Sequence, residues 1–345
     1  MDDVEGPTAN STVGKEEEGC MECVLVPVLE ALILVTGLMG HSLVLIILVR
    51  RQRGGRRRPN GTDTLLLALS VADLLLLLCL PFHTAATALN RWPFGIYLCK
   101  AVSFLGAACS SASAFTLAAL AVTRFLTVVY PTWAYRSQMQ RWLRLVVSGL
   151  WVPAIALAAP QFAFRALGPT TQLHCFAFLS DISQLVYGIV HFLIAFALPL
   201  AIIVTMYSKI YFFLHRTRRE GRAPQLERYQ NQVTRTSGLL VLAFTLCWLP
   251  SYVLMFVMLG RNTANVPHYG PVAILARLLA ISSTVANPIL YVFMSHKFRA
   301  DLLNVVKGIW CGIHGDCSCC RGRGTYHTRK RNGTDPVELE PSAKP

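Results

Sequence analysis

The sequence predicts an all-α membrane protein, a bundle of seven transmembrane helices followed by a short amphipathic eighth helix. Hydrophobic residues make up 54% of the 345 residues and charged residues only 14%, and the mean hydropathy is +0.47. Soluble domains carry about 25% charged residues. The apolar residues also form long runs, with basic residues in short blocks between them. Together these observations predict a chain that is largely surrounded by lipid.

Seven apolar runs are long enough to cross a bilayer as helices, which takes about 17–25 residues. They cover 24–49, 64–90, 97–130, 142–164, 183–214, 233–259 and 271–294. This division predicts an N-terminal tail at 1–23, a seven-helix bundle at 24–294, an amphipathic helix at 295–310 and a C-terminal tail at 311–345.

Positive charge predicts which side of the membrane each connecting segment occupies. Of the 32 lysines and arginines, 26 gather where the first run leads to the second, the third to the fourth and the fifth to the sixth, or follow the last run. By the positive-inside rule these segments are cytoplasmic, so the N-terminus is extracellular and the C-terminus cytoplasmic. Because the net charge of +14 is explained by these loops, we expect no nucleic-acid partner.

The N-terminal tail carries a glycosylation sequon. It reads MDDVEGPTANSTVGKEEEG and lacks the apolar segment of a cleavable signal peptide, so we expect the first helix to direct insertion. Asn10 begins the sequence Asn-Ser-Thr, and its extracellular side predicts that it is glycosylated.

The cysteines divide by the side of the membrane they reach. Cys99 and Cys175 lie outside, where disulfides form, so they can pair, with two free thiols as the alternative. Inside, Cys317, Cys319 and Cys320 follow an amphipathic, basic stretch close to the membrane. That position favours palmitoylation over a metal site, and unmodified thiols are the third alternative.

Asp73, in LALSVADLLLLL, is an ionisable residue within a predicted span. Such residues are costly in a bilayer and usually functional. The other polar groups expected at the same depth are His41, Ser113, Ser283 and Asn287. Two interpretations stay open together: a hydrogen-bonded hub among the helices, and a cation or proton site whose occupancy changes when the bundle moves.

Three prolines lie within the later spans, each with an aromatic residue nearby: Pro199 with Phe196, Pro250 with Trp248, and Pro288 with Tyr291. Proline removes a backbone hydrogen bond and clashes with the carbonyl four residues before it, so each helix can bend there. Three such positions predict a bundle in which ligand binding at one end shifts helices at the other.

In these features the chain resembles the rhodopsin-like (class A) G-protein-coupled receptors across residues 24–308. The matching residues stand in the family's order: Asp73 in LALSVAD, Trp92, Phe94-Gly95, Cys99, Arg124, Pro131, Trp151, Pro199, Tyr207, FTLCWLP at 244–250, NPILY at 287–291 and the stretch that begins at Phe298. Each motif is short, but their joint occurrence at these separations is specific to the family.

The resemblance implies a plasma-membrane receptor that is not an enzyme, with an outer cavity for a ligand and an inner face for a heterotrimeric G protein. It implies arrestin, receptor kinases and membrane lipid as further partners, and a disulfide between Cys99 and Cys175. The residues that it implies for activation and coupling are Thr123, Arg124, Phe125, Tyr207, Phe244, Trp248, Pro250, Asn287, Pro288 and Tyr291.

The resemblance also implies an allosteric sodium ion held by Asp73 and Ser113. Here the sequence departs from the family, because His41 replaces the usual asparagine of the first helix. A protonated His41 beside Asp73 is the alternative to sodium. No cofactor other than this ion is expected.

Several ligand classes of this family require particular residues in the receptor, and the presence or absence of these residues narrows the choice of ligand. The run 271–294 has no lysine for retinal, and Gly106 stands where amine receptors place an aspartate. The long segment 165–182 fits the β-hairpin of peptide receptors. The stretches WPFGIYLCKAVSFL and SAFTLAALAVTRFLTVVYP are most similar to the galanin, allatostatin and kisspeptin receptor group, and within it the resemblance favours a galanin-receptor-like chain. Candidate ligand-binding residues are His83, His174, Phe178, Tyr187, His191, Tyr252 and Arg277. Arg277 can pair with a peptide carboxylate.

One departure bears on the resting state. The family's acid before Arg124 is replaced by Thr123, and the sixth-helix acid that some relatives use is replaced by Gln230. We therefore keep as an alternative an atypical receptor with constitutive or absent G-protein coupling. A seven-helix transporter or channel is the alternative from another class, although it needs more aligned charges within the membrane than Asp73 provides.

Overall fold

The computed structural model describes residues 13–53, 61–89, 91–134, 137–167, 175–177, 181–219, 224–260, 270–294 and 296–314. The chain divides into two compact units, Met1–Leu302 and Leu303–Pro345. The first unit contains the helix bundle, and the second contains the C-terminal part of α10 (His296–His314).

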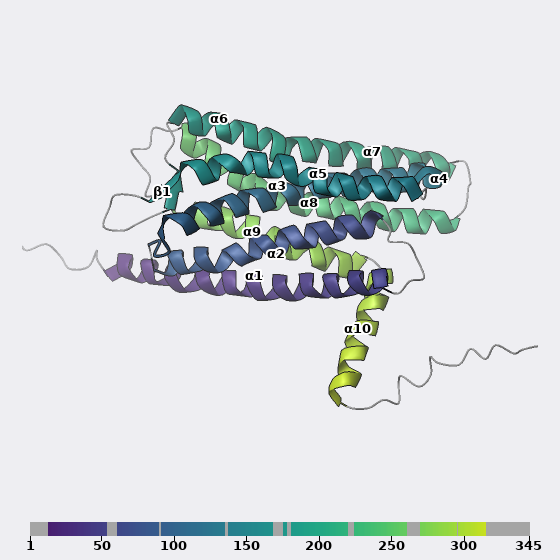
Figure 1. Ribbon diagram of the computed structural model, residues 1–345, viewed down its shortest axis with the longest axis horizontal. Coiled ribbons are helices and arrows are strands. Elements are labelled where there is room, and N and C mark those ends of the chain that lie inside the picture. Colours follow the sequence, from purple (N-terminus) through teal and green to yellow (C-terminus); the bar gives the residue numbers. More distant parts are fainter. Residues whose placement is uncertain are drawn as a thin grey trace, which may run out of the picture. The chain divides into compact units, whose positions relative to one another are not determined.

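Long helices make up the first unit and lie side by side in one bundle (Figure 1). They are α1 (Val13–Arg53), α2 (Gly61–Ala88), α3 (Gly95–Val129), α5 (Ser137–Phe164), α8 (Pro224–Gly260) and α9 (Gly270–Met294). A further long stretch is continuous through α6 (Asp181–Phe192), the π-helical turn η1 (Leu193–Ala197) and α7 (Leu198–Arg219), and α4 (Pro131–Ala134) is a single turn. The seven predicted helices are confirmed.

The helices that can span a membrane correspond to the apolar runs of the sequence. Within the described residues six helical stretches are long and apolar enough to cross a membrane, and α8 contributes a shorter apolar segment, Val241–Val257. Several boundaries differ from the sequence-based division, and α8 begins at Pro224, nine residues before the predicted run 233–259. Helix α1 begins at Val13, although its apolar span begins only at Val24, and α10 continues to His314. The segment that extends α1 before Val24 is rich in charged residues, so that helix continues beyond its apolar part.

Helix α3 is central, because it packs against α2, α5 and α7, while α1 packs against α2 and α9. Small residues permit the close approach of α1. A Cβ atom added at Gly37 would lie 2.7 Å from a methyl group of Leu77 in α2, and one added at Gly40 would lie 2.8 Å from Pro288 in α9. Close approach through small residues is the usual way in which membrane helices pack.

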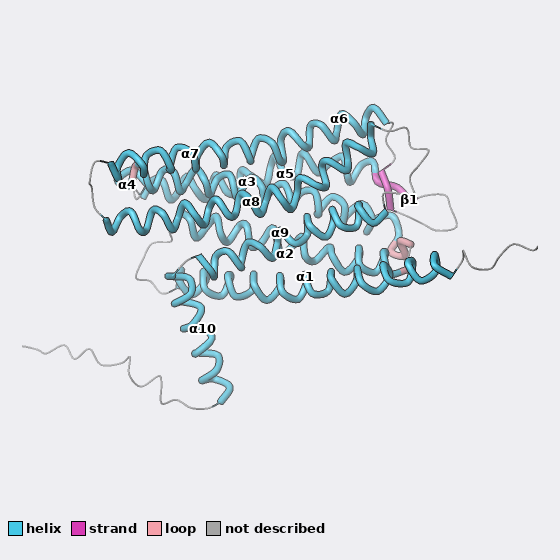
Figure 2. The backbone as a smooth tube through the Cα atoms, turned by 180° about the vertical axis from the view of Figure 1, so that it is seen from behind, coloured by secondary structure: helices cyan, strands magenta, loops and turns pink. Residues whose placement is uncertain are grey.

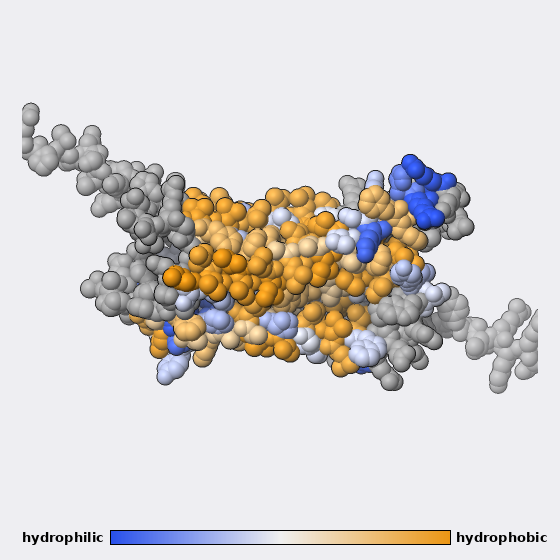
Figure 3. Space-filling view, turned by 90° about the horizontal axis from the view of Figure 1, so that it is seen from above, coloured by the Kyte–Doolittle hydropathy of each residue, from blue (hydrophilic) through white to orange (hydrophobic). Residues whose placement is uncertain are grey.

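The outside of the bundle is apolar. Large hydrophobic side chains such as Leu145, Val152 and Leu246 are exposed, and Figure 3 shows a broad orange surface over the middle of the molecule. Buried polar side chains lie inside, among them Glu30, His41, Asp73, Thr123 and Asn287. This inverted arrangement is what a lipid solvent requires.

The π-helical turn Leu193–Ala197 ends two residues before Pro199. Proline has no N–H to donate to the carbonyl four residues earlier, and its ring clashes there, so the preceding turn widens. The widened turn lies where Phe196 is buried. The predicted irregularity at Pro199 is thus a π-helical turn.

Two short strands stand at one end of the bundle (Figure 2). Strand β1 (Arg165–Leu167) pairs antiparallel with β2 (Cys175–Ala177), with Arg165 opposite Ala177 and Leu167 opposite Cys175. The predicted hairpin in the segment 165–182 therefore forms.

Candidate functional site

A hydrogen-bonded hub surrounds Asp73 in the middle of the bundle. The Asp73 side chain is buried, with 2% of the residue exposed. The Ser113 hydroxyl donates to Oδ1 at 2.8 Å, and the Asn287 amide donates to Oδ2 at 2.7 Å. Both carboxylate oxygens therefore have a partner, and the hub joins α2, α3 and α9.

His41 completes this hub from α1. Its Nε2 lies 2.8 Å from the carbonyl oxygen of Thr284 and 3.5 Å from Oδ2 of Asp73. Because a carbonyl can only accept, Nε2 carries the hydrogen and donates to it. Nδ1 is buried and has no hydrogen-bond partner among the described residues. The structure thus places His41 beside Asp73, where the sequence suggested a substitute for a cation.

A small cavity of about 20 Å³ joins this hub to the aromatic residues of α8. Its lining residues are Asp73, Leu76, Ser113, Leu117, Ala243, Phe244, Trp248, Ser283, Ala286 and Asn287. A space of this size holds about one water molecule or a small ion. The cavity therefore brings the predicted hub residues against the predicted switch residues Phe244 and Trp248.

Three candidate ligand-binding residues meet between α6 and α8. The His191 ring lies 5.7 Å from the Tyr187 ring, and its Nδ1 is 3.2 Å from the Tyr252 hydroxyl. On its other side, His191 Nε2 is 3.5 Å from the Ser111 hydroxyl of α3. The Tyr187 hydroxyl donates to the carbonyl of Leu157 in α5 at 3.0 Å. This outer cluster thus connects α3, α5, α6 and α8.

A stack of aromatic rings leads from this cluster toward the cavity. Phe196 of η1 lies 5.1 Å from Tyr252 and is stacked on Phe244 at 5.6 Å, measured between ring centroids. Phe244 in turn lies 6.4 Å from Trp248. Pro250, in the same helix, is half-buried. The ring contacts give a physical route from the outer cluster to the wall of the cavity.

The predicted carboxylate partner of Arg277 lies within the chain. Its Nη2 donates to Oε1 of Glu30 in α1 and, at 3.0 Å, to the hydroxyl of Thr87 in α2. Glu30 is fully buried, and its Oε2 accepts a hydrogen bond from Thr84. Sequence reasoning missed Glu30, although it is the one acid in the apolar run 24–49.

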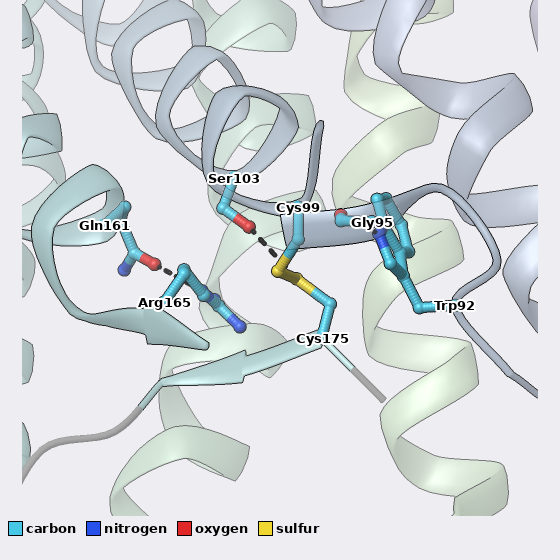
Figure 4. The surroundings of a disulfide bond; sticks show 7 residues. All are labelled: Trp92, Gly95, Cys99, Ser103, Gln161, Arg165 and Cys175. Carbon is cyan, nitrogen blue, oxygen red and sulfur yellow. Dashed lines mark hydrogen bonds between the residues drawn. A yellow bond between two sulfur atoms is a disulfide. The ribbon is translucent and has the colours of Figure 1, made fainter. Parts of the chain in front are cut away.

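The outer end of α3 is held by the predicted disulfide. Cys99 and Cys175 are bonded, with their Cα atoms 5.7 Å apart, which confirms the pairing (Figure 4). Trp92 packs in the same buried cluster, 6.1 Å from the ring of His83. The bond ties β2 to α3. His174 and Phe178, predicted beside it, lie outside the described residues.

The inner end of α3 shows how Thr123 and Arg124 are placed. The Thr123 hydroxyl donates to the carbonyl of Ala119 in its own helix at 2.9 Å, and no described side chain forms a hydrogen bond or ion pair with the Arg124 guanidinium. Phe125 lies under the ammonium group of Lys209, 5.9 Å from the ring centroid. Thr123 therefore does not replace the missing acid as a partner of Arg124.

Four further residues were predicted to act in activation or in the resting state. Tyr207 is half-buried, and Pro288 is buried against α1, whereas the side chains of Tyr291 and Gln230 lie outside the described residues. The modification sites predicted from the sequence, Asn10, Cys317, Cys319 and Cys320, also lie outside the described residues.

A second feature that sequence reasoning missed is the position of Arg51 at the inner end of α1. Its Nε donates to Asp301 of α10 at 2.7 Å, its Nη1 lies 3.3 Å from Asp63 of α2, and its guanidinium lies 5.8 Å from the centre of the Phe298 ring. The arginine-rich segment 50–58 gave no signal that one of its members is structural.

Comparisons with known proteins agree with this arrangement. A family model described as 7 transmembrane receptor (rhodopsin family) matches residues 40–291. Galanin receptor type 2 of Mus musculus is 30% identical over 292 residues, which cover 84% of this chain and 77% of that receptor. Galanin receptor type 1 of Rattus norvegicus is 30% identical over 293 residues, 83% of each chain. Neuropeptide Y receptor type 6 of Mus musculus is 27% identical over 360 aligned residues, 95% of each chain.

Proposed function

The chain belongs to the rhodopsin family of seven-transmembrane receptors, and we propose that it binds an extracellular peptide and activates heterotrimeric G proteins at the plasma membrane. The relatives support a peptide ligand, because they are receptors named for galanin and neuropeptide Y. The positive-inside distribution supports an extracellular N-terminus and a cytoplasmic C-terminus. Arrestin and receptor kinases are the further partners that this function requires.

One observation carries the proposal: the cavity shared by the Asp73 hub and the aromatic residues of α8. Asp73, Ser113 and Asn287 hold α2, α3 and α9 together beside the cavity, and Phe244 and Trp248 form its opposite wall. The ring stack connects the outer cluster to the cavity, and the polar hub lines the same cavity. A movement of α8 therefore changes its contacts with the hub, so two arrangements of α8 can differ in energy.

The mechanism begins at the outer cluster. A ligand that displaces or strengthens the His191–Tyr252 contact changes the position of α8, because Tyr252 belongs to that helix. The stacked pair Phe196 and Phe244 carries the movement inward. At the inner end, a shift of α8 opens the surface around Arg124, whose guanidinium is then available to the G protein. The ligand acts by binding one arrangement more tightly than the other.

The hub also contains carboxylate and hydroxyl oxygen atoms, which are suitable ligands for a sodium ion. Asp73 and Ser113 line the cavity, so the carboxylate and the hydroxyl of these two residues would hold the ion. A bound cation would supply positive charge beside the carboxylate. His41 is the competing source of positive charge, since its Nε2 lies 3.5 Å from Asp73. In either case Nε2 keeps its bond to Thr284.

A second candidate function, a receptor that is partly active without ligand, is favoured by the inner end of α3. The Thr123 hydroxyl is bonded within its own helix, and Arg124 has no described ionic partner. An ion pair formed only in the resting state stabilises the inactive arrangement, by about 0–1 kcal/mol when exposed and by more when desolvated. Without such a pair the inactive arrangement is less stable by that amount.

Expression of the full chain in cultured cells tests the proposal. We expect a change in cAMP, calcium or G-protein dissociation on addition of a peptide from a panel that includes galanin, neuropeptide Y and somatostatin. His191→Ala should weaken the response, while Tyr97→Ala, at an exposed outer position, should leave it unchanged. If no neuropeptide in an exhaustive panel gives a response although surface expression is confirmed, the proposal is wrong.

The same cells test the orientation and the modifications. We propose that Asn10 is glycosylated, so Asn10→Gln should remove a mass shift that glycosidase also removes. We propose that Cys317, Cys319 and Cys320 are palmitoylated, so their replacement by serine should abolish labelling with a palmitate analogue. Labelling that survives these substitutions would place the acyl group elsewhere.

A further inference from the structure

Two arginines at the outer end of the bundle differ in their partners. Arg277 of α9 is paired with Glu30, whose side chain is 0% exposed. Arg165, the first residue of β1, donates from Nε to the amide oxygen of Gln161 at 2.9 Å (Figure 4). No carboxylate among the side chains that the structure describes forms an ion pair or hydrogen bond with Arg165. One guanidinium is therefore neutralised inside the chain, and the other has only a neutral described partner.

The burial of Arg165 makes the lack of a described ionic partner energetically important. The residue is half-buried, and burial lowers the pKa of its guanidinium, with a smaller opposing effect from Tyr187. A lowered pKa means that the charged form has lost water without equal compensation. Such a cation gains more from a carboxylate than a fully hydrated cation does, since charge-assisted pairs strengthen as solvent is excluded.

We propose that Arg165 binds a carboxylate of the peptide ligand. The inference rests on the proposed function and adds to it the chemical class of one contact. It also moves the ligand's anionic contact away from Arg277, the arginine that the sequence suggested. The buried Glu30 already balances the charge of Arg277.

The partners of Arg165 hold it in place and connect it to the outer cluster. Gln161 donates from its amide nitrogen to the Tyr187 hydroxyl at 3.2 Å, and that hydroxyl donates to the Leu157 carbonyl. Tyr187 in turn contacts His191, which bonds Tyr252. A carboxylate bound at Arg165 therefore acts on a chain of contacts that ends in α8.

The backbone of Arg165 is fixed as well. It pairs with Ala177 in β2, the strand that the disulfide ties to α3. The guanidinium is thus presented from a constrained hairpin, which lowers the conformational entropy lost on binding. Arginine also suits the task, because its planar fork matches a carboxylate with two parallel hydrogen bonds.

Binding of matched peptide mixtures to the purified full chain tests the proposal. Two fluorescent mixtures of 12-residue peptides have random positions and one fixed residue, aspartate in one and asparagine in the other, with amidated C-termini. A third has the fixed asparagine and a free C-terminal carboxylate, which distinguishes a side-chain carboxylate from a terminal one. The chain should retain one of the acidic mixtures about tenfold more than the neutral one.

Substitutions assign this preference to one arginine. Arg165→Gln should abolish it, and Arg165→Lys should keep part of it. Lys100→Gln is the matched control, because it removes another positive charge at the same end of the bundle, where Lys100 contacts only Phe162 and the Ala163 carbonyl among the described residues. Equal retention of the mixtures by the wild-type chain, or an acid preference that survives Arg165→Gln, would overturn the proposal.

Thermal stability without ligand gives an independent test. Removing a desolvated cation that lacks an ionic partner should raise the melting temperature or leave it unchanged, so Arg165→Gln should not melt below the wild-type chain. Arg277→Gln should melt lower, because it leaves Glu30 buried and unpaired. A loss with Arg165→Gln equal to that with Arg277→Gln would show that an internal acid already holds Arg165, and would refute the assignment.

These results separate this inference from the proposed function. A peptide response in cells together with equal retention of the mixtures would uphold the receptor and reject Arg165 as the carboxylate site. An acid preference that depends on Arg165, in a chain that gives no cellular response, would do the reverse.

Discussion

The two sides of the bundle are joined by different kinds of contact. On the side of α1, α2 and α9, polar links cross between helices at three depths. They join Glu30 to Arg277 and Thr84, Asp73 to His41 and Asn287, and Arg51 to Asp63 and Asp301. On the side of α6, η1 and α8, the contacts are largely between rings, with His191 bonded to Tyr252 at the outer end.

This difference indicates which side can move. A hydrogen bond or ion pair inside a low-dielectric bundle is directional, and a partner left alone there is costly. Ring contacts have several arrangements of similar energy, offset-stacked or edge-to-face. We therefore expect α1, α2 and α9 to stay together while α8 shifts against η1 and α7. The following predictions test that expectation, in order of decreasing effect.

The ion pair at the outer end should give the largest loss of stability. Arg277→Gln leaves the fully buried Glu30 without its cation and should lower the free energy of unfolding by about 3 kcal/mol. Glu30→Gln should cost less, because 32% of the Arg277 side chain is exposed and can reach water. Thermal unfolding of the purified chain measures both.

The double variant provides the control for this pair. Replacing both Glu30 and Arg277 by glutamine removes both charges, so it should be more stable than Arg277→Gln alone. A larger loss with Glu30→Gln than with Arg277→Gln would mean that the arginine, not the glutamate, carries the desolvation cost.

The central hub should give a smaller loss. Asn287→Ala removes the donor to Oδ2 of Asp73 and should lower the free energy of unfolding by about 1–3 kcal/mol. Ser283→Ala is the matched control, since the Ser283 hydroxyl also lines the cavity but donates only to the carbonyl of Ala280 in its own helix, among the described atoms. Equal losses for the two variants would contradict a hub centred on Asp73.

On the aromatic side we expect the effect to appear in signalling more than in stability. Phe244→Leu keeps a large apolar side chain, so it should lower the free energy of unfolding by about 1 kcal/mol. It removes the ring stacked on Phe196 and should reduce the ligand response in a G-protein dissociation assay. Phe256→Leu, which loses a contact with Phe192 away from the cavity, serves as the control. A normal ligand response from Phe244→Leu would show that the ring stack is not needed for activation.

Contacts that depend on residue type could be predicted from the sequence. Contacts that depend on how each helix is rotated about its axis could not. Asp73, Ser113 and His41 were predicted to meet because polar groups within a span must find one another. The disulfide followed from compartment and family resemblance. In contrast, Glu30 and Arg277 lie 247 positions apart, and their meeting depends on which face α1 turns toward α9. No local pattern encodes that rotation.

Other features could not be predicted because they depend on competition between partners. The hydroxyl of Thr123 could bond to Arg124 or to its own helix, and the structure shows the bond to Ala119. Arg51 could not be distinguished from its neighbouring arginines until Asp63 and Asp301 were placed around it. The π-helical turn at Leu193–Ala197 likewise requires coordinates, since Pro199 indicates an irregularity but not its form.

The inner end of α3 should give the smallest energetic effect, and it tests whether the absence of an acid leaves the receptor partly active. Thr123→Asp places a carboxylate at a buried position next to the half-buried Arg124. The cost of burying the carboxylate offsets much of the attraction, so we expect a net contribution of about 0–1 kcal/mol. That range corresponds to a reduction of basal signalling by up to about fivefold. Constitutive G-protein dissociation in cells with matched surface expression measures it.

Thr123→Val is the control for this last substitution, because it removes the hydroxyl bonded to Ala119 but introduces no charge. It should leave basal signalling unchanged if charge at this position is what restrains Arg124. A rise with Thr123→Asp, or an equal change with both variants, would show that the resting state is maintained elsewhere. The ionic contacts of α1, α2 and α9 would then be the main restraint, and Arg277→Gln should raise basal signalling in the same assay.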